Sequence, residues 1–172
     1  MNRLTRLPAR CPAAPVGALL WCLLAPAAVP AAGAVPPAPE AAAPAIEWRN
    51  YREGKAAARH RERPLLVFFT TAWSSEGARL DREIWTDERV RAYVADNLVA
   101  ARVDIQEMPA VGAHFGVDEP PAVLLAAPDG RALVILRGFH VADSILRVST
   151  YAASGAWEYA DYETWLSRQR NR

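Results

Sequence analysis

Hydroxyl and carboxylate side chains that could do chemistry stand together directly after Trp73. Ser74, Ser75 and Glu76 follow one another there. A serine nucleophile needs a base within hydrogen-bonding reach and a third group that orients the base. The sequence places no histidine beside Ser74, and it has no G-x-S-x-G pattern. We therefore expect Ser74 or Ser75 to cap a helix and Glu76 to lie in its first turn.

Cysteines and histidines, which carry most thiol and metal chemistry, are few in this chain. The cysteines are Cys11 and Cys22, and the histidines are His60, His114 and His140. No two histidines have the spacing of neighbouring metal ligands, such as H-x-x-x-H, and no cysteine lies near them. We expect neither a metal nor a cofactor, with ligand or metal binding at the histidines as the less favoured alternative.

The first 34 residues have the pattern of a signal peptide. Arg3, Arg6 and Arg10 precede a short apolar segment at 16–25, and a small-residue cleavage site ends at Ala34. The apolar segment is interrupted by prolines and is shorter than a comfortable membrane span. We expect cleavage near this site and a periplasmic or secreted protein, with a retained membrane anchor as the alternative.

Cleavage there would remove both cysteines, so the mature protein would contain no thiol. It would also change the formal charge from +1 to −2, because the segment holds three arginines and no acidic residue. The whole chain has 20 basic and 19 acidic residues. This balance indicates neither a nucleic-acid partner nor membrane contact beyond the signal peptide.

The rest of the chain divides into a Pro/Ala-rich linker at 35–45, a domain at 46–153 and a C-terminal extension at 154–172. Apolar periodicity and turn signals predict the elements of the domain. Helices are expected over 51–61, after Trp73, from 86 to 97, over 109–115 and over 142–151, and strands over 65–70, 98–105, 122–127 and 132–136. This order favours an α/β fold in which helices flank a mixed sheet.

The C-terminal extension is rich in aromatic residues, namely Trp157, Tyr159, Tyr162 and Trp165. Asp161 is a candidate helix cap, so a short extra helix is expected here. Packing of the aromatic side chains onto the domain is the favoured interpretation, and a surface for contact with a partner is the alternative.

Several sequence features occur in the order found in one known family. The apolar run LLVFFTTAW follows an Arg-Pro pair and precedes SSEG, then come LDREIWTDERVRAYVADNLVAARVDI, FGVDEPPAVLLAAPDG and RGFHVADSIL. From Trp48 to about Val148 the chain resembles the thioredoxin-like superfamily, and most nearly its exported disulfide-interchange C-terminal domains and their single-domain relatives. The resemblance implies a thioredoxin-like α/β fold, here with an extra C-terminal helical tail.

The resemblance also shows what is missing from the usual active site, the motif W-C-x-x-C. Trp73 keeps the tryptophan of the motif, whereas Ser74 and Gly77 occupy the two cysteine positions. Phe68 takes the place of a buried carboxylate, and Pro121 falls on a cis-proline that faces the motif. Because disulfide exchange requires a thiolate that attacks sulfur, we expect this motif to have no catalytic residue.

Members of the superfamily bind extended peptide beside the cis-proline. Here Trp73, Ser74, Ser75, Pro120 and Pro121 would line that groove, although Pro120 has no N–H to donate to a bound chain. We expect a non-catalytic binding, assembly or chaperone-like module whose partner is an envelope protein or an extended peptide. The alternative is a thiol-disulfide oxidoreductase by descent, acting in cell redox homeostasis, that has diverged at its active site.

Overall fold

The computed structural model describes residues 43–171, so the predicted signal peptide, its cleavage site and most of the linker lie outside the described residues. Within 43–171, no helix combines the length and the apolar character that crossing a membrane requires. The helices are α1 (Tyr51–Arg61), α2 (Ser75–Glu83), α3 (Glu88–Asn97), α4 (Pro109–His114), α5 (Ala142–Ala153), the 3-10 helix η1 (Ala156–Glu158) and α6 (Tyr162–Arg170). The strands are β1 (Leu65–Thr70), β2 (Val99–Asp104), β3 (Ala122–Ala126) and β4 (Ala132–Arg137).

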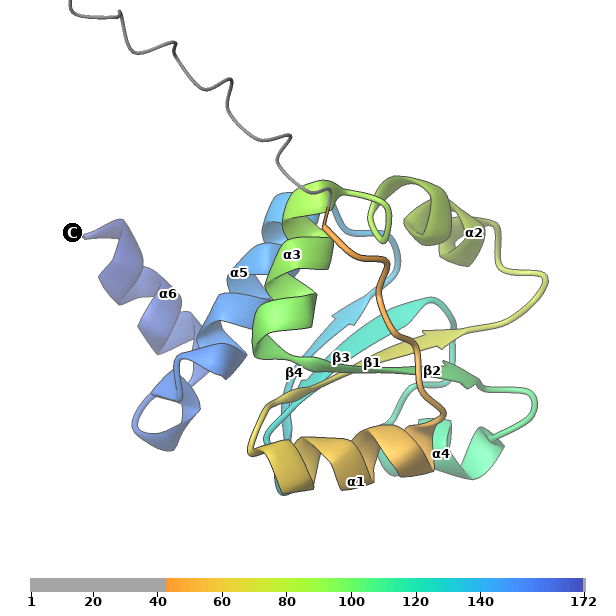
Figure 1. The fold of residues 1–172 in the computed structure, drawn as a ribbon, viewed down its shortest axis with the longest axis horizontal. Helices are drawn as coiled ribbons and strands as arrows, with labels where there is room; N and C mark the ends of the chain where they lie inside the picture. Colours follow the sequence, from red (N-terminus) through yellow and green to blue (C-terminus); the bar gives the residue numbers. More distant parts are fainter. Residues whose placement is uncertain (1–42, 172) are drawn as a thin grey trace, which may run out of the picture. The chain divides into compact units, whose positions relative to one another are not determined.

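The four strands form one mixed sheet in the order β2-β1-β3-β4. β1 and β2 run parallel, whereas β3 is antiparallel to both β1 and β4. Helices α1 and α4 cover one face, and α3 and α5 cover the other, as Figure 1 shows. The predicted thioredoxin-like α/β fold with a mixed sheet between helices is therefore confirmed.

β1 is buried along its whole length because helices cover both faces of the sheet at this strand. Leu66 and Phe68 point into the core on the α3 and α5 side. Leu65, Val67 and Phe69 point into the core beneath α1. This alternation follows from the two-residue period of a strand. Because β1 lies between β2 and β3, it is an inner strand of the sheet.

The segment before α1 covers the outer edge of β2. The Arg49 N–H donates to the carbonyl of Ala100, and the Arg102 N–H donates to the carbonyl of Arg49, at 3.1 and 2.9 Å. Trp48 then packs against Phe68 and Trp85, with ring centroids 5.9 and 5.3 Å apart. These contacts protect an edge that would otherwise present unpaired backbone groups.

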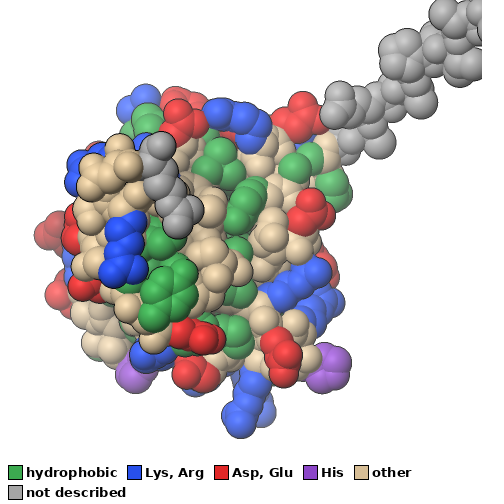
Figure 2. All heavy atoms as spheres, turned by 90° about the vertical axis from the view of Figure 1, so that its left-hand side faces the viewer, with side chains coloured by type: hydrophobic (Ala, Val, Ile, Leu, Met, Phe, Trp, Pro, Cys, Tyr) green, Lys and Arg blue, Asp and Glu red, His purple; other side chains and the backbone are tan. Residues whose placement is uncertain are grey.

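The C-terminal extension packs onto α5 through its aromatic side chains. Trp165 is buried against Tyr151, whose hydroxyl donates to the carbonyl of Ala160 at 2.8 Å. The Trp157 indole N–H donates to the carbonyl of Ala152, whereas Tyr159 stays 71% exposed. Figure 2 shows apolar side chains interspersed with charged ones on this side of the domain. Packing is therefore the observed arrangement for the tail aromatics other than Tyr159.

Candidate functional site

The degenerate motif lies between the end of β1 and the start of α2. Ser74 is the residue before α2, and its Oγ accepts a hydrogen bond from the Gly77 N–H at 3.0 Å. Its own N–H donates to the carbonyl of Thr71 at 3.2 Å, and its carbonyl accepts from Ala78 at 2.9 Å. The side chain is buried, with 6% of the residue exposed. The prediction that a serine of the motif caps a helix is confirmed for Ser74.

The second cysteine position, Gly77, is tightly enclosed. A Cβ atom built on Gly77 would lie 2.5 Å from Thr70 Oγ1 and 3.1 Å from Ser74 Oγ. The glycine is thus packed against the last residue of β1 and against the capping serine. This contact was not predicted, because it depends on how the Thr70 side chain is turned toward the helix.

The cis-proline faces a shallow hollow on the side of α2 that carries Glu76. The Pro120–Pro121 peptide bond is cis, as the family resemblance predicts, and the Pro121 carbonyl accepts from Gly138 N–H at 2.8 Å. The hollow has a volume of about 360 Å³. Its lining consists of Glu76, Gly116, Asp118, Glu119, Pro120, Pro121, Arg137 and Gly138. Three carboxylates that sequence reasoning did not single out as a group therefore surround the two prolines.

A second hollow, of about 340 Å³, lies where β1 and β2 end. Its lining consists of Thr70, Thr71, Ala72, Ser74, Ala78, Asp81, Arg102 and Asp104. The predicted groove residues are thus divided between two hollows: Pro120 and Pro121 line the first, and Ser74 lines the second. Trp73 and Ser75 line neither of them and are exposed, Trp73 to 66%.

An ion pair crosses the second hollow between the guanidinium of Arg102 and the carboxylate of Asp81. Arg102 stands opposite Phe68 in the parallel register of β1 and β2, and its guanidinium lies 5.0 Å from the centre of the Phe68 ring. The position where thioredoxins carry a buried carboxylate therefore holds an aromatic ring beneath a paired cation. No acid of the described part of the chain replaces that carboxylate on β1 itself.

The three histidines come from separate elements. His60 lies in the last turn of α1, His114 ends α4, and His140 follows β4 with its Nε2 3.0 Å from the Arg137 carbonyl oxygen. Among residues 43–171, no three His, Asp or Glu side chains gather in a way that could hold a metal ion.

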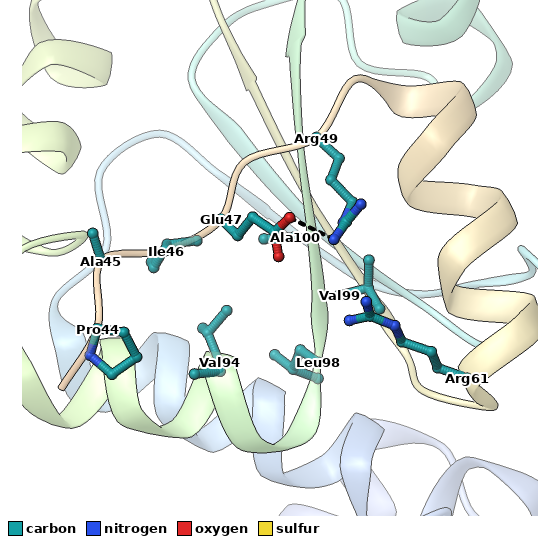
Figure 3. Close-up of a pocket in the computed structure, with 11 residues that line it drawn as sticks. Pro44, Ala45, Ile46, Glu47, Arg49, Arg61, Val94, Leu98, Val99 and Ala100 are labelled. Atoms are coloured by element: carbon teal, nitrogen blue, oxygen red, sulfur yellow. Dashed lines mark hydrogen bonds and ion pairs between the residues drawn. The ribbon is translucent and has the colours of Figure 1, made fainter.

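A third hollow, of about 200 Å³, lies between residues 44–49 and the junction of α3 with β2 (Figure 3). Val94, Leu98 and Val99 supply much of its apolar wall, and its charged groups are Arg61 and the Glu47–Arg49 ion pair. No hydroxyl, thiol or imidazole side chain lines it. It offers no nucleophile, so the motif remains the candidate site.

Comparisons with known proteins agree with this geometry. Residues 47–128 match the family model described as Thioredoxin-like. The fold is similar to a thioredoxin from Thermus thermophilus, with 17% identity, a TM-score of 0.59, and 65% of this chain and 90% of that one covered.

Two further solved structures are similar in fold. A DsbH oxidoreductase has 17% identity and a TM-score of 0.57, with 66% of this chain and 88% of that one covered. The reduced C-terminal domain of DsbD from Neisseria meningitidis has 19% identity and a TM-score of 0.53, with 59% and 91% covered. No curated protein sequence matched significantly. The relationship is thus to a fold family that includes thiol-disulfide oxidoreductases: the fold is thioredoxin-like, and residues 47–128 carry the match to the Thioredoxin-like family model.

Proposed function

We propose that this protein is an exported thioredoxin-like module that binds a partner in the cell envelope and does not catalyse disulfide exchange. The observation that carries the proposal is the state of the two thiol positions. Ser74 is buried as a helix cap, and Gly77 has no side chain and no room for one as packed. The only cysteines of the chain are Cys11 and Cys22, which fall in the predicted signal peptide.

The chemistry of exchange explains why these substitutions matter. A thiolate attacks a disulfide sulfur, forms a mixed disulfide, and is released when a second thiol attacks it. A serine hydroxyl cannot form that mixed disulfide. Among the described residues, Ser74 has no hydrogen bond to a histidine, and its Oγ accepts from the Gly77 N–H. Neither sulfur chemistry nor serine nucleophilic catalysis is therefore supported at this site.

A binding role is supported by what the scaffold retains. Trp73, the first residue of the motif, is 66% exposed. The hollow next to cis Pro121 is lined mostly by residues that are themselves exposed to solvent. An exposed tryptophan is a common energetic anchor in protein interfaces. We propose an envelope protein or an extended peptide as the partner. Because Pro120 lacks an N–H, side-chain contacts would have to replace one of the backbone hydrogen bonds that such a peptide normally receives.

The experiment uses the purified chain as bait against a solubilised envelope fraction. Trp73→Ala is expected to lose the captured partner, whereas Tyr159→Ala is expected to keep it. Tyr159 is a matched control because it is an equally exposed aromatic residue, at 71%, in the C-terminal tail. Equal capture by both variants would contradict the proposed surface. Cleavage is tested separately, on protein expressed from the full sequence and isolated from the envelope. Its intact mass should correspond to a chain beginning at Val35, and a full-length mass would contradict cleavage.

The alternative function is that of a thiol-disulfide oxidoreductase, and the fold relationship favours it. Under that alternative the protein is an oxidoreductase by descent, related to cell redox homeostasis, whose active site has diverged. Dithiothreitol-dependent reduction of insulin by the purified chain separates the two functions.

A further inference from the structure

We infer that Thr70 closes the second thiol position of the motif, so that the site has room for one sulfur but not for two. The inference rests on the proposed loss of disulfide exchange and adds a third residue to it. Loss of the chemistry would then be a packing property of β1 and α2 together, not only the absence of two cysteines.

The space around Gly77 is closed on two sides. A Cβ on this residue would lie 2.5 Å from Thr70 Oγ1, whereas real Cβ atoms essentially never approach another heavy atom within 3.0 Å. Ser74 adds a second wall, with its Oγ and Cβ at 3.1 and 3.2 Å. A cysteine at this position would have to place both a Cβ and a larger sulfur into that space.

Thr70 is poorly placed to move away. It is the last residue of β1, it is 8% exposed, and it stands opposite Asp104 in the parallel pairing with β2. Its carbonyl accepts a hydrogen bond from the Ile105 N–H at 3.1 Å, which fixes the backbone. Threonine is branched at Cβ and has few χ1 options, and because Thr70 lines the hollow of about 340 Å³, only a rotamer that turns its hydroxyl into that hollow would relieve the contact.

The first thiol position is different. Ser74 is one of the residues that line the hollow of about 340 Å³ at the ends of β1 and β2, so we expect the larger sulfur of a cysteine at this position to find space on the side of the hollow. A single Ser74→Cys substitution should therefore be accommodated. It would react with oxidised glutathione to give one mixed disulfide and release one reduced glutathione. With both cysteines introduced, the second thiol would complete an internal disulfide and release the other glutathione only if it fits beside position 70.

The test uses the full chain in a Cys11→Ser, Cys22→Ser background, so that only introduced thiols react. Four variants are compared after incubation with oxidised glutathione. They are Ser74→Cys, Ser74→Cys with Gly77→Cys, the latter pair with Thr70→Ala, and the same pair with Thr70→Ser. The serine variant keeps the hydroxyl but loses the methyl group that restricts its rotation, so its rate of internal disulfide formation is expected to fall between those of the double and Thr70→Ala variants.

The readouts are intact mass and free-thiol content. The Thr70→Ala variant is expected to form the internal disulfide, with no thiol and no adduct. The double variant is expected to stop at the glutathione adduct, or to form the internal bond roughly tenfold or more slowly, the size of effect that overpacking produces. Equal rates of internal disulfide formation in the double and Thr70→Ala variants would overturn the inference.

A second arm covers failure of the double variant to fold. Gly77→Ala is expected to lower the melting temperature, and adding Thr70→Ala is expected to restore most of the loss. Additive effects of the two substitutions would contradict a direct clash. Neither arm involves partner binding or the activity of the unsubstituted protein, so failure here is distinguishable from failure of the proposed function.

Discussion

At the scale of single residues, the motif forms an ordinary helix start, in which the Ser74 hydroxyl caps α2 by accepting a hydrogen bond from the Gly77 N–H. The capping role of Ser74 could be predicted because a serine follows a strand and precedes a helical pattern. The contact between Gly77 and Thr70 could not, because it depends on a side-chain rotamer across a tight strand–helix connection. The sequence thus predicts the cap but not the enclosure of the neighbouring position.

Replacing Ser74 by alanine tests the cap. The Gly77 N–H would lose its acceptor in a buried place, so the free energy of unfolding is expected to fall by about 1 kcal/mol. Urea denaturation measures the change. Ser75→Ala is the control, because Ser75 is exposed, and its effect should stay within about 0.5 kcal/mol. Equal effects of the two substitutions would show that the hydrogen bond from Gly77 contributes nothing.

At the scale of elements, helix and strand positions could be predicted closely, because continuous apolar runs mark strands such as β1 and β3, and prolines or caps mark the ends. The thioredoxin-like fold came from the family resemblance, and the order of the strands within the sheet was not predicted. The Asp81–Arg102 pair was not predicted, because it needs the parallel register that brings Arg102 opposite Phe68. Long-range pairs of this kind depend on how elements meet, which local patterns do not contain.

The start of α3 provides a pH test at this scale. Arg89 donates to the Asp87 carboxylate and also pairs with Asp143 on α5, so it joins two helices. The hydrogen bond from Arg89 is the main cause of a pKa of Asp87 below its ordinary value of 3.8, and the N–H groups of Val90 and Arg89 add to it. A carboxyl whose pKa is lowered by folding stabilises the folded state above its unfolded pKa. That contribution is lost as the pH falls through the folded pKa.

We therefore expect Asp87→Asn to destabilise the protein more at pH 7 than at pH 3, since the aspartate is largely protonated at the lower pH in the unfolded chain. Denaturation curves at the two pH values measure the difference. Asp96→Asn is the control on the same helix, because Asp96 is exposed and forms no ion pair within the described residues. A cost of Asp87→Asn that does not change with pH would contradict this account.

At the scale of the whole molecule, the protein keeps the thioredoxin-like framework while its usual reactive centre is filled by a capping serine and an enclosed glycine. The predicted binding residues do not form one groove: the prolines line one hollow, Ser74 lines another, and Trp73 is exposed. Their separation could not be predicted, because it depends on which way each side chain points where the start of α2 meets the loop before β3. The proposed binding role therefore rests on the exposed Trp73 and on the retained framework.

The most direct test of this account is dithiothreitol-dependent reduction of insulin by the purified chain carrying Cys11→Ser and Cys22→Ser. An ordinary thioredoxin, assayed alongside, provides the reference rate. We expect no turnover above the rate with dithiothreitol alone, because no thiolate is present to attack the insulin disulfides. Insulin reduction at a rate comparable to that of the reference thioredoxin would contradict the central claim that this scaffold binds without exchanging disulfides.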